Sequence, residues 1–158
     1  MKLFLDTADV STIKEAYSTG LIDGLTTNPT LMMKSGDIPD KVYYELKHLG
    51  IRDISMEVVA DTSQDMLDEA RRLIGLFGDC VTIKVPCTPE GLKACKELAR
   101  QNVRVNVTLI FSAAQAILSS KAGATYVSPF VGRVDDNSFD GLALIKEISD
   151  IYEKQFVH

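Results

Sequence analysis

The chain has 158 residues, of which 46% are hydrophobic and 25% are charged, a composition typical of a globular protein with one hydrophobic core. Its formal net charge is −5 and it contains no basic block, which argues against nucleic acid as a partner. No apolar run is long enough to cross a bilayer, and the chain does not open with a signal-peptide pattern. We therefore expect a cytoplasmic protein without membrane association, folded as a single domain over residues 1–158.

Strand and helix signals alternate about six times along the chain. In chain order, the expected elements are a strand over 3–5 and a helix over 10–17, a strand over 24–27 and a helix over 39–47, a strand over 54–59 and a helix over 66–77, a strand over 81–86 and a helix from 89, a strand over 103–109 and a helix to 123, and a strand over 125–128 and a helix over 142–152. Thr62 with Asp65 resembles a capping box, and Thr88 followed by Pro89 has the pattern of an N-cap and a first helical residue. The stretch that precedes the last helix is expected to be a loop.

Regular alternation of strands and helices predicts βαβ units around a parallel sheet. Such a sheet is either open and doubly wound or closed as a barrel. No glycine-rich phosphate-binding motif follows any expected strand, which removes the usual nucleotide-binding reason for an open sheet. We therefore predict an α/β fold of the (β/α)₈ TIM-barrel type, of which this chain contains about six βα units.

Polar residues near the strand ends share one parity, and apolar residues take the other. Because side chains alternate along a strand, Asn106 and Thr108 share a face, while Val105, Val107 and Leu109 are expected to face helices. The same argument applies to each strand, and the resulting set is Asp6, Asn28, Glu57, Lys84, Asn106, Thr108 and Ser128. Any one of these residues can be a simple strand-end cap. Their coincidence at the carboxyl ends of barrel strands predicts a catalytic pocket.

Lys84 is the one charged residue in a short β-branched run, Val81 to Pro86. Burial lowers the pKa of a lysine, and a neutral amine can attack a sugar carbonyl to form a Schiff base. The alternative is a lysine that reaches solvent or pairs with a carboxylate for structural reasons. A Schiff-base lysine needs an acid/base, for which Glu57 and then Asp6 are the candidates, and Glu57 and Thr108 are placed to hold a water.

Arg133 follows the sixth strand, where a guanidinium can bind a substrate phosphate or simply be a solvated loop residue. The cysteines, three in number, lack metal-ligand or disulfide spacing, and only two histidines are present, so we expect reduced thiols and no metal site. Residues 136–147 loosely fit a calcium-loop pattern, but those after Gly141 are in phase with a helix, which argues against it.

Five stretches of the sequence resemble the motifs of the transaldolase family, in order and spacing. They are Phe4-Leu5-Asp6-Thr7, Thr26-Thr27-Asn28-Pro29-Thr30, Ile83-Lys84-Val85-Pro86, Asn106-Val107-Thr108-Leu109 and Tyr126-Val127-Ser128-Pro129-Phe130-Val131-Gly132-Arg133. The resemblance covers essentially the whole chain and is to the small-subunit branch of the family, which also contains fructose-6-phosphate aldolases.

The resemblance implies transfer of a dihydroxyacetone unit from a ketose phosphate, such as sedoheptulose 7-phosphate or fructose 6-phosphate, to an aldose phosphate, such as glyceraldehyde 3-phosphate or erythrose 4-phosphate. It implies a Schiff base at Lys84, acid/base catalysis by Asp6, and a proton-relay water held by Glu57 and Thr108. No metal or organic cofactor is implied. The residues that the resemblance assigns to substrate binding are Thr27, Asn28, Asn106, Ser128, Phe130 and, for a phosphate group, Arg133.

Two alternatives remain open within this resemblance. The aldolases of the branch carry Gln where Glu57 stands and Tyr where Phe130 stands, so these two residues favour transaldolase over a fructose-6-phosphate aldolase. The other alternative is a fragment without catalytic activity. The resemblance also implies a ring-like homo-oligomer.

A closed barrel of this type needs eight βα units, whereas the expected elements end with the sixth. Residues 155–158 have the pattern of an approach to a seventh strand. A truncated product, a shortened chain, or strands supplied by another polypeptide would each explain the difference.

Overall fold

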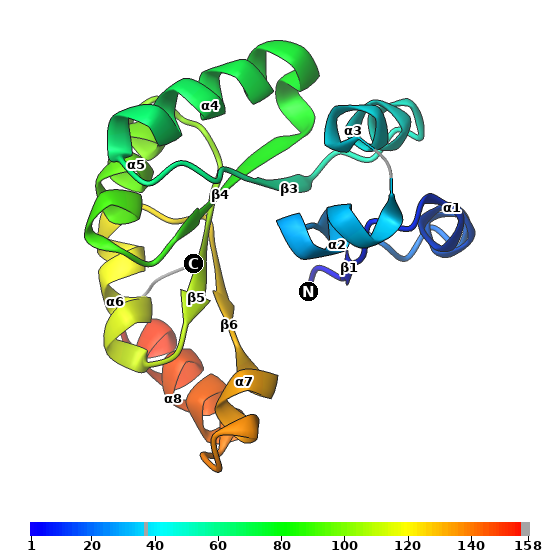
Figure 1. Cartoon of the computed structure of the whole chain (residues 1–158). Coiled ribbons are helices and arrows are strands. Elements are labelled where there is room, and N and C mark those ends of the chain that lie inside the picture. The colour runs from blue at the N-terminus through cyan, green and yellow to red at the C-terminus, as the bar shows by residue number, and fades with distance from the viewer. Residues whose placement is uncertain (37, 156–158) are drawn as a thin grey trace. The chain divides into compact units, whose positions relative to one another are not determined.

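The computed structural model describes residues 1–36 and 38–155, which divide into two compact units. The first unit comprises Met1–Val59 and Asp68–Ile83, and the second comprises Ala60–Leu67 and the described residues from Lys84 onward. Figure 1 labels most of the following elements: β1 (Phe4–Asp6), α1 (Val10–Ser18), β2 (Gly24–Thr26), α2 (Pro29–Ser35), α3 (Pro39–His48), β3 (Ile54–Glu57), α4 (Ser63–Phe77), β4 (Val81–Pro86), α5 (Pro89–Arg100), β5 (Val105–Ile110), α6 (Ala113–Ala122), β6 (Tyr126–Pro129), α7 (Val131–Asp136) and α8 (Gly141–Lys154).

The strands follow one another in chain order, β1-β2-β3-β4-β5-β6. In the first unit β1 pairs in parallel with β2, and β2 with β3; in the second unit β5 pairs in parallel with β6. A doubly wound sheet reverses its strand order at a switch point, whereas a barrel sheet keeps the order of the chain. The fold is therefore α/β of the (β/α)₈ TIM-barrel type with six βα units, as the sequence predicts.

The first unit has its core between its strands and helices. Leu25 of β2 and Ile54 of β3 are fully buried. The ring of Phe77, at the end of α4, meets the rings of Tyr43 and Tyr44 edge to face, with centroids 5.5 and 5.0 Å apart. These aromatic contacts attach α3 to the end of α4 by burying large apolar surfaces.

In the second unit, α5 and α6 pack against β5, and α8 packs against α6 (Figure 1). Val105 and Val107 of β5 and Cys95 of α5 are 0% exposed, so an apolar core lies between these elements. The hydroxyl of Tyr152 in α8 donates a hydrogen bond of 2.7 Å to the carbonyl of Ala116 in α6. Apolar packing and this bond together hold the helices on the sheet.

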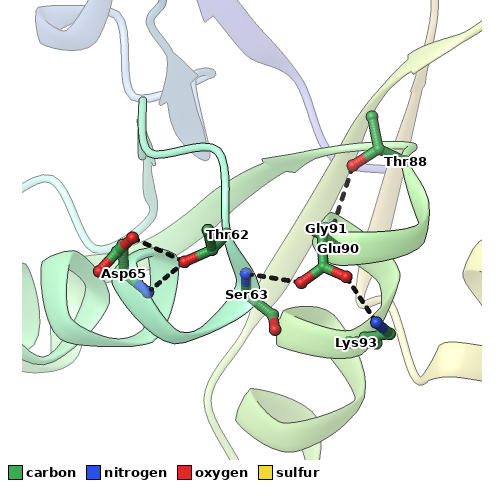
Figure 2. A network of polar contacts seen from close by, with 7 residues as sticks. All are labelled: Thr62, Ser63, Asp65, Thr88, Glu90, Gly91 and Lys93. Atoms are coloured by element: carbon green, nitrogen blue, oxygen red, sulfur yellow. Dashed lines mark hydrogen bonds and ion pairs between the residues drawn. The ribbon is translucent and has the colours of Figure 1, made fainter.

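The predicted helix starts are confirmed at α4 and α5 (Figure 2). The Thr62 hydroxyl accepts a hydrogen bond of 3.2 Å from the Asp65 N–H and donates one of 2.6 Å to the Asp65 carboxylate. The Thr88 hydroxyl accepts a bond of 3.0 Å from the Gly91 N–H. Each cap satisfies a backbone donor that has no partner within its own helix.

Figure 2 also shows Glu90 linking the first turns of the two helices. Its carboxylate pairs with Lys93 of the same helix and accepts a hydrogen bond of 3.0 Å from the Ser63 N–H at the start of α4. The bond from Lys93, followed by that from Ser63, lowers the pKa of Glu90 to about 2. A negative charge also suits the positive ends of both helix dipoles.

Two short helices, α2 and α7, are absent from the sequence prediction. Asn28 and Pro29, which follow the second strand, begin α2: the Asn28 side chain accepts a hydrogen bond of 2.9 Å from the Leu31 N–H, and Pro29 is the first helical residue. Gly36 ends this helix with φ of 74°, a conformation that glycine adopts without strain. The predicted loop before the last helix contains α7, which has no side-chain N-cap to reveal it.

The alternation of side chains in β5 also differs from the prediction at its end. Leu109 was expected to face the helices, but its side chain is 38% exposed, whereas Ile110 is 0% exposed. The cause is a shift of register: Val107 pairs with Val127, but Ile110 pairs with Pro129, so Thr108 and Leu109 lie opposite one residue of β6. A β-bulge of this kind reverses the parity of all the residues that follow it.

The predicted approach to a seventh strand lies outside the described residues, except for Gln155, which is the C-cap of α8.

Candidate active site

In the first unit, β1 and β2 bring together Asp6 and Thr26. The two residues are register partners, and the Thr26 hydroxyl donates a hydrogen bond of 2.8 Å to the exposed Asp6 carboxylate. Asp6 was predicted as a site residue, whereas Thr26 was not assigned a role. The signal for Thr26 is its position two residues before Asn28, which places both on one face of the strand end.

Asn28 and Glu57 line one cavity of about 330 Å³ within the first unit. Asn28 is the N-cap of α2, and Glu57 is the last residue of β3. The cavity also contains the ion pair between Arg72 and Asp40, with N···O distances of 2.8 and 3.2 Å. Both predicted residues thus lie on an accessible surface at the end of their strands.

Thr27 is 0% exposed, and its hydroxyl makes hydrogen bonds with two groups of the first unit. It lies 3.0 Å from the Tyr43 hydroxyl of α3 and donates a bond of 3.0 Å to the Ser55 carbonyl of β3. Burial raises the pKa of Tyr43 to about 12, against the opposing effect of the Thr27 bond and with a further contribution from the charge of Glu57. Thr27 therefore fixes the backbone that carries Asn28.

In the second unit, Lys84 lies in β4 with only 5% of its surface exposed. Val85, which follows it, is fully buried. The structure thus places Lys84 inside a strand, as predicted from the β-branched run. An amine in such a place is largely removed from bulk water.

Asn106 and Ser128 are joined directly across β5 and β6. The Ser128 hydroxyl donates a hydrogen bond of 2.8 Å to the side-chain oxygen of Asn106, which is 3% exposed. Two of the predicted substrate-binding residues are therefore neighbours.

Thr108 is 1% exposed, and its hydroxyl has no hydrogen-bond partner among the residues that the structure describes. Its backbone carbonyl is engaged, since it accepts a bond of 2.9 Å from the Cys87 N–H just after β4. Buried hydroxyls are nearly always paired, so a buried hydroxyl without a protein partner is suited to bind a water or a substrate group. The role of Thr108 in holding a water stays a prediction.

Phe130 and Arg133 lie where β6 leads into α7. The ring of Phe130 meets that of Phe111 edge to face, with centroids 5.5 Å apart. Arg133 and Phe111 line a cavity of about 660 Å³ in the second unit, together with the start of α6. The exposed guanidinium is therefore available to an anionic group.

No group of three or more His, Cys, Asp or Glu side chains suited to a metal ion occurs in residues 1–36 and 38–155. The second half of the segment that loosely fits a calcium loop, from Gly141 onward, forms the start of α8, where the Asp140 carboxylate caps the helix by accepting a bond of 2.9 Å from the Ala143 N–H. Cys80, Cys87 and Cys95 form no disulfide within the described part of the chain. No helix in the described part of the chain is long and apolar enough to span a bilayer.

A profile of the family described as Transaldolase/Fructose-6-phosphate aldolase matches residues 3–157. A "Probable transaldolase" of Nitrosopumilus maritimus is 49% identical over 158 residues, covering all of this chain and 70% of the relative. Those of Geobacter metallireducens and Caldicellulosiruptor saccharolyticus are 51% and 52% identical, over 97% and 96% of this chain and 71% and 70% of their own lengths.

Among solved structures, the carboxyl transferase domain of Rhizobium etli pyruvate carboxylase aligns with a TM-score of 0.53 over 96% of this chain and 34% of the other. At 13% sequence identity this is a likeness of fold alone. The family profile and the sequence relatives support more than a shared fold, because the profile matches nearly the whole chain and the relatives are about 50% identical to it. The chain is therefore a member of the transaldolase/fructose-6-phosphate aldolase family.

Proposed function

We propose that this chain is a transaldolase that transfers a dihydroxyacetone unit from a ketose phosphate to an aldose phosphate through a Schiff base at Lys84. The observation that carries the proposal is the burial of Lys84, 5% exposed within β4, in a chain of the transaldolase/fructose-6-phosphate aldolase family. Schiff-base chemistry needs a lysine amine as nucleophile, and Lys84 supplies one inside the strand whose end carries the family motif.

In the proposed reaction, the Lys84 amine attacks the C2 carbonyl of the ketose, and the resulting carbinolamine loses water to give an iminium ion. Asp6 then accepts the proton of the C4 hydroxyl as the C3–C4 bond breaks. The electron pair of that bond passes to the iminium, which becomes an enamine, and the aldose leaves as an aldehyde. Attack of the enamine on a second aldose and hydrolysis of the new iminium restore Lys84.

The proton transfers at Lys84 need a relay, which we assign to a water held by Glu57 and Thr108. The Thr108 hydroxyl supports this role because it is buried without a partner among the described residues. The Thr26 hydroxyl, 2.8 Å from the carboxylate of Asp6, fixes the orientation of that proposed acid/base.

Substrate binding is proposed for the remaining polar and aromatic residues of the strand ends. Asn106 and Ser128, which are bonded to each other, are assigned to substrate hydroxyl groups together with Asn28, and Phe130 to the wall of the site. Thr27 supports Asn28 from its buried position. Arg133 is assigned to the phosphate of sedoheptulose 7-phosphate or fructose 6-phosphate.

Transaldolase rather than fructose-6-phosphate aldolase is favoured by the names of the relatives at about 50% identity. Glu57 and Phe130 favour the same activity, through the resemblance on which they were first assigned. Product analysis separates the two activities: a transaldolase needs an aldose acceptor for turnover, whereas an aldolase releases dihydroxyacetone without one. We further propose a cytoplasmic homo-oligomer whose reaction uses no metal or organic cofactor.

The decisive experiment is reduction by borohydride in the presence of fructose 6-phosphate, followed by intact mass measurement. We expect the wild-type chain and the variant Lys96→Met, altered at an exposed lysine of α5, to gain one reduced adduct, and Lys84→Met to gain none. The absence of an adduct on the wild-type chain, or its persistence in Lys84→Met, would overturn the proposal.

A further inference from the structure

The bulge in β5 lies directly beside the proposed relay residue. Thr108 and Leu109 together face a single residue of β6, because the register shifts between Val107 and Ile110. Bulges are common next to active sites, where they redirect a side chain. The question is what holds the bulge in place.

The backbone of Leu109 has φ of 60°, in the left-handed region. Only two other residues besides glycine have positive φ in the described part of the chain, Asn102 and Ser138, and both are small polar residues at turns. Leucine rarely adopts this conformation, because its Cβ approaches the following carbonyl. A leucine within a strand at this φ is therefore a feature that its surroundings must maintain.

Two backbone hydrogen bonds hold the bulge on either side. The Cys87 N–H donates to the Thr108 carbonyl, and the Phe130 N–H donates to the Ile110 carbonyl, each at 2.9 Å. Between these two bonds the left-handed turn at Leu109 reverses the alternation of side chains. As a result Thr108 stays buried on the face that carries Asn106, while Ile110 enters the apolar core at 0% exposure.

We propose that Leu109 is a positioning residue, whose left-handed backbone aims the Thr108 hydroxyl at the site of proton relay. A regular strand would have to place Thr108 and Ile110 on the same face, and burial of Ile110 in the core would then compete with burial of the Thr108 hydroxyl at the site. The bulge removes this competition. The inference rests on the proposed function, since it concerns the relay assigned to Thr108.

A series of substitutions at Leu109 separates backbone conformation from apolar character. Glycine and asparagine accept positive φ, whereas valine, with its branched Cβ, strongly disfavours it. Valine is the most apolar of the three residues, so tolerance of positive φ and apolar character predict opposite effects on the rate. We expect Leu109→Gly and Leu109→Asn to form the borohydride-trapped adduct within about threefold of the wild-type rate, and Leu109→Val to be about tenfold slower or more.

The matched control is Asn102→Val, which introduces the same conflict with positive φ outside β5. We expect this variant to lose stability while keeping the wild-type rate of adduct formation. In the double variant Leu109→Val with Thr108→Val, the rate should be no lower than in Thr108→Val alone, because both changes remove the same hydroxyl from its place.

Amide hydrogen exchange measured by NMR gives a second readout that does not depend on activity. The amides of Cys87 and Phe130 should exchange at least about tenfold faster in Leu109→Val than in wild type, and at the wild-type rate in Leu109→Asn and in the control. If Leu109→Val does not fold, Leu109→Ala takes its place, with an intermediate effect expected on both readouts.

The outcomes distinguish this inference from the proposed function. A wild-type chain that forms no adduct overturns the proposed function. Equal amide exchange in the valine and glycine variants, or a rate that follows apolar character, overturns the role of Leu109. If only Leu109→Val, and neither Leu109→Gly nor Leu109→Asn, shows faster amide exchange and slower adduct formation, the results support both the proposed function and the positioning role of Leu109.

Discussion

Gly91, in the first turn of α5, is the position where the smallest change should have a large effect. A Cβ added there would lie 2.0 Å from the Pro86 carbonyl oxygen at the end of β4 and 3.1 Å from its carbon. Atoms do not approach a Cβ closer than 3.0 Å, so helix and strand end would have to separate by roughly 1 Å. Such overpacking costs about 3 kcal/mol, and the better helix propensity of alanine returns about 1 kcal/mol.

We therefore expect Gly91→Ala to lower the free energy of unfolding by about 2 kcal/mol, measured by urea denaturation. Gly75 in α4 is the matched control, because nothing lies within 4 Å of its added Cβ. Gly75→Ala should raise the free energy of unfolding by about 0.5–1 kcal/mol through helix propensity alone. If both variants shift the urea midpoint in the same direction, the argument from close packing at Pro86 is wrong.

Three further changes test the polar contacts. Thr82→Val should lower the free energy of unfolding, measured by urea denaturation, by about 2 kcal/mol, because the buried Asp53 carboxylate, 4% exposed, loses a hydrogen bond of 2.6 Å. Thr82→Ser, which keeps the hydroxyl, should retain most of the wild-type stability. The pKa of Glu90 is about 2, against an ordinary 4.5, so the stability that Glu90 contributes is complete above pH 4.5 and is lost as the pH falls towards 2. We expect Glu90→Gln to flatten the pH dependence of the free energy of unfolding in that range. An unchanged slope would contradict the link between Glu90 and this pH dependence. In a double-mutant cycle, Thr27→Val and Tyr43→Phe should together cost about 1 kcal/mol less than the sum of the single changes, whereas strict additivity would mean that the two hydroxyls do not interact.

The sequence predicted the βα alternation because its signals are local. Apolar periodicity and caps such as Thr88 with Pro89 depend only on neighbouring residues, and the structure has the same caps. The helix α2 carries the same pair of signals, Asn28 with Pro29, but an Asn-Pro pair also marks turns, and the helix has only seven residues. α7 has no capping side chain and offered no such signal.

The alternation of side chains along β5 predicted that Thr108 shares a face with Asn106, but it did not predict the β-bulge that follows Thr108. Leucine is among the residues least expected at positive φ, so no local rule predicts a left-handed turn at Leu109. The cause is tertiary, since the bulge lets Ile110 be buried in the core. The contact between Thr26 and Asp6 was not predicted for a different reason: the two residues lie 20 positions apart, and only strand register shows that they meet.

The buried hydroxyl of Tyr43 provides an optical reporter of the first unit. The chain contains no tryptophan, so tyrosinate absorbance in alkali is free of overlap from indole rings. With its pKa raised to about 12, Tyr43 ionises well after an ordinary tyrosine would, and its titration shifts to lower pH when α3 separates from β2 and β3. A titration followed by absorbance can therefore monitor the integrity of the strand end that carries Asn28, in the native sequence and without any attached label.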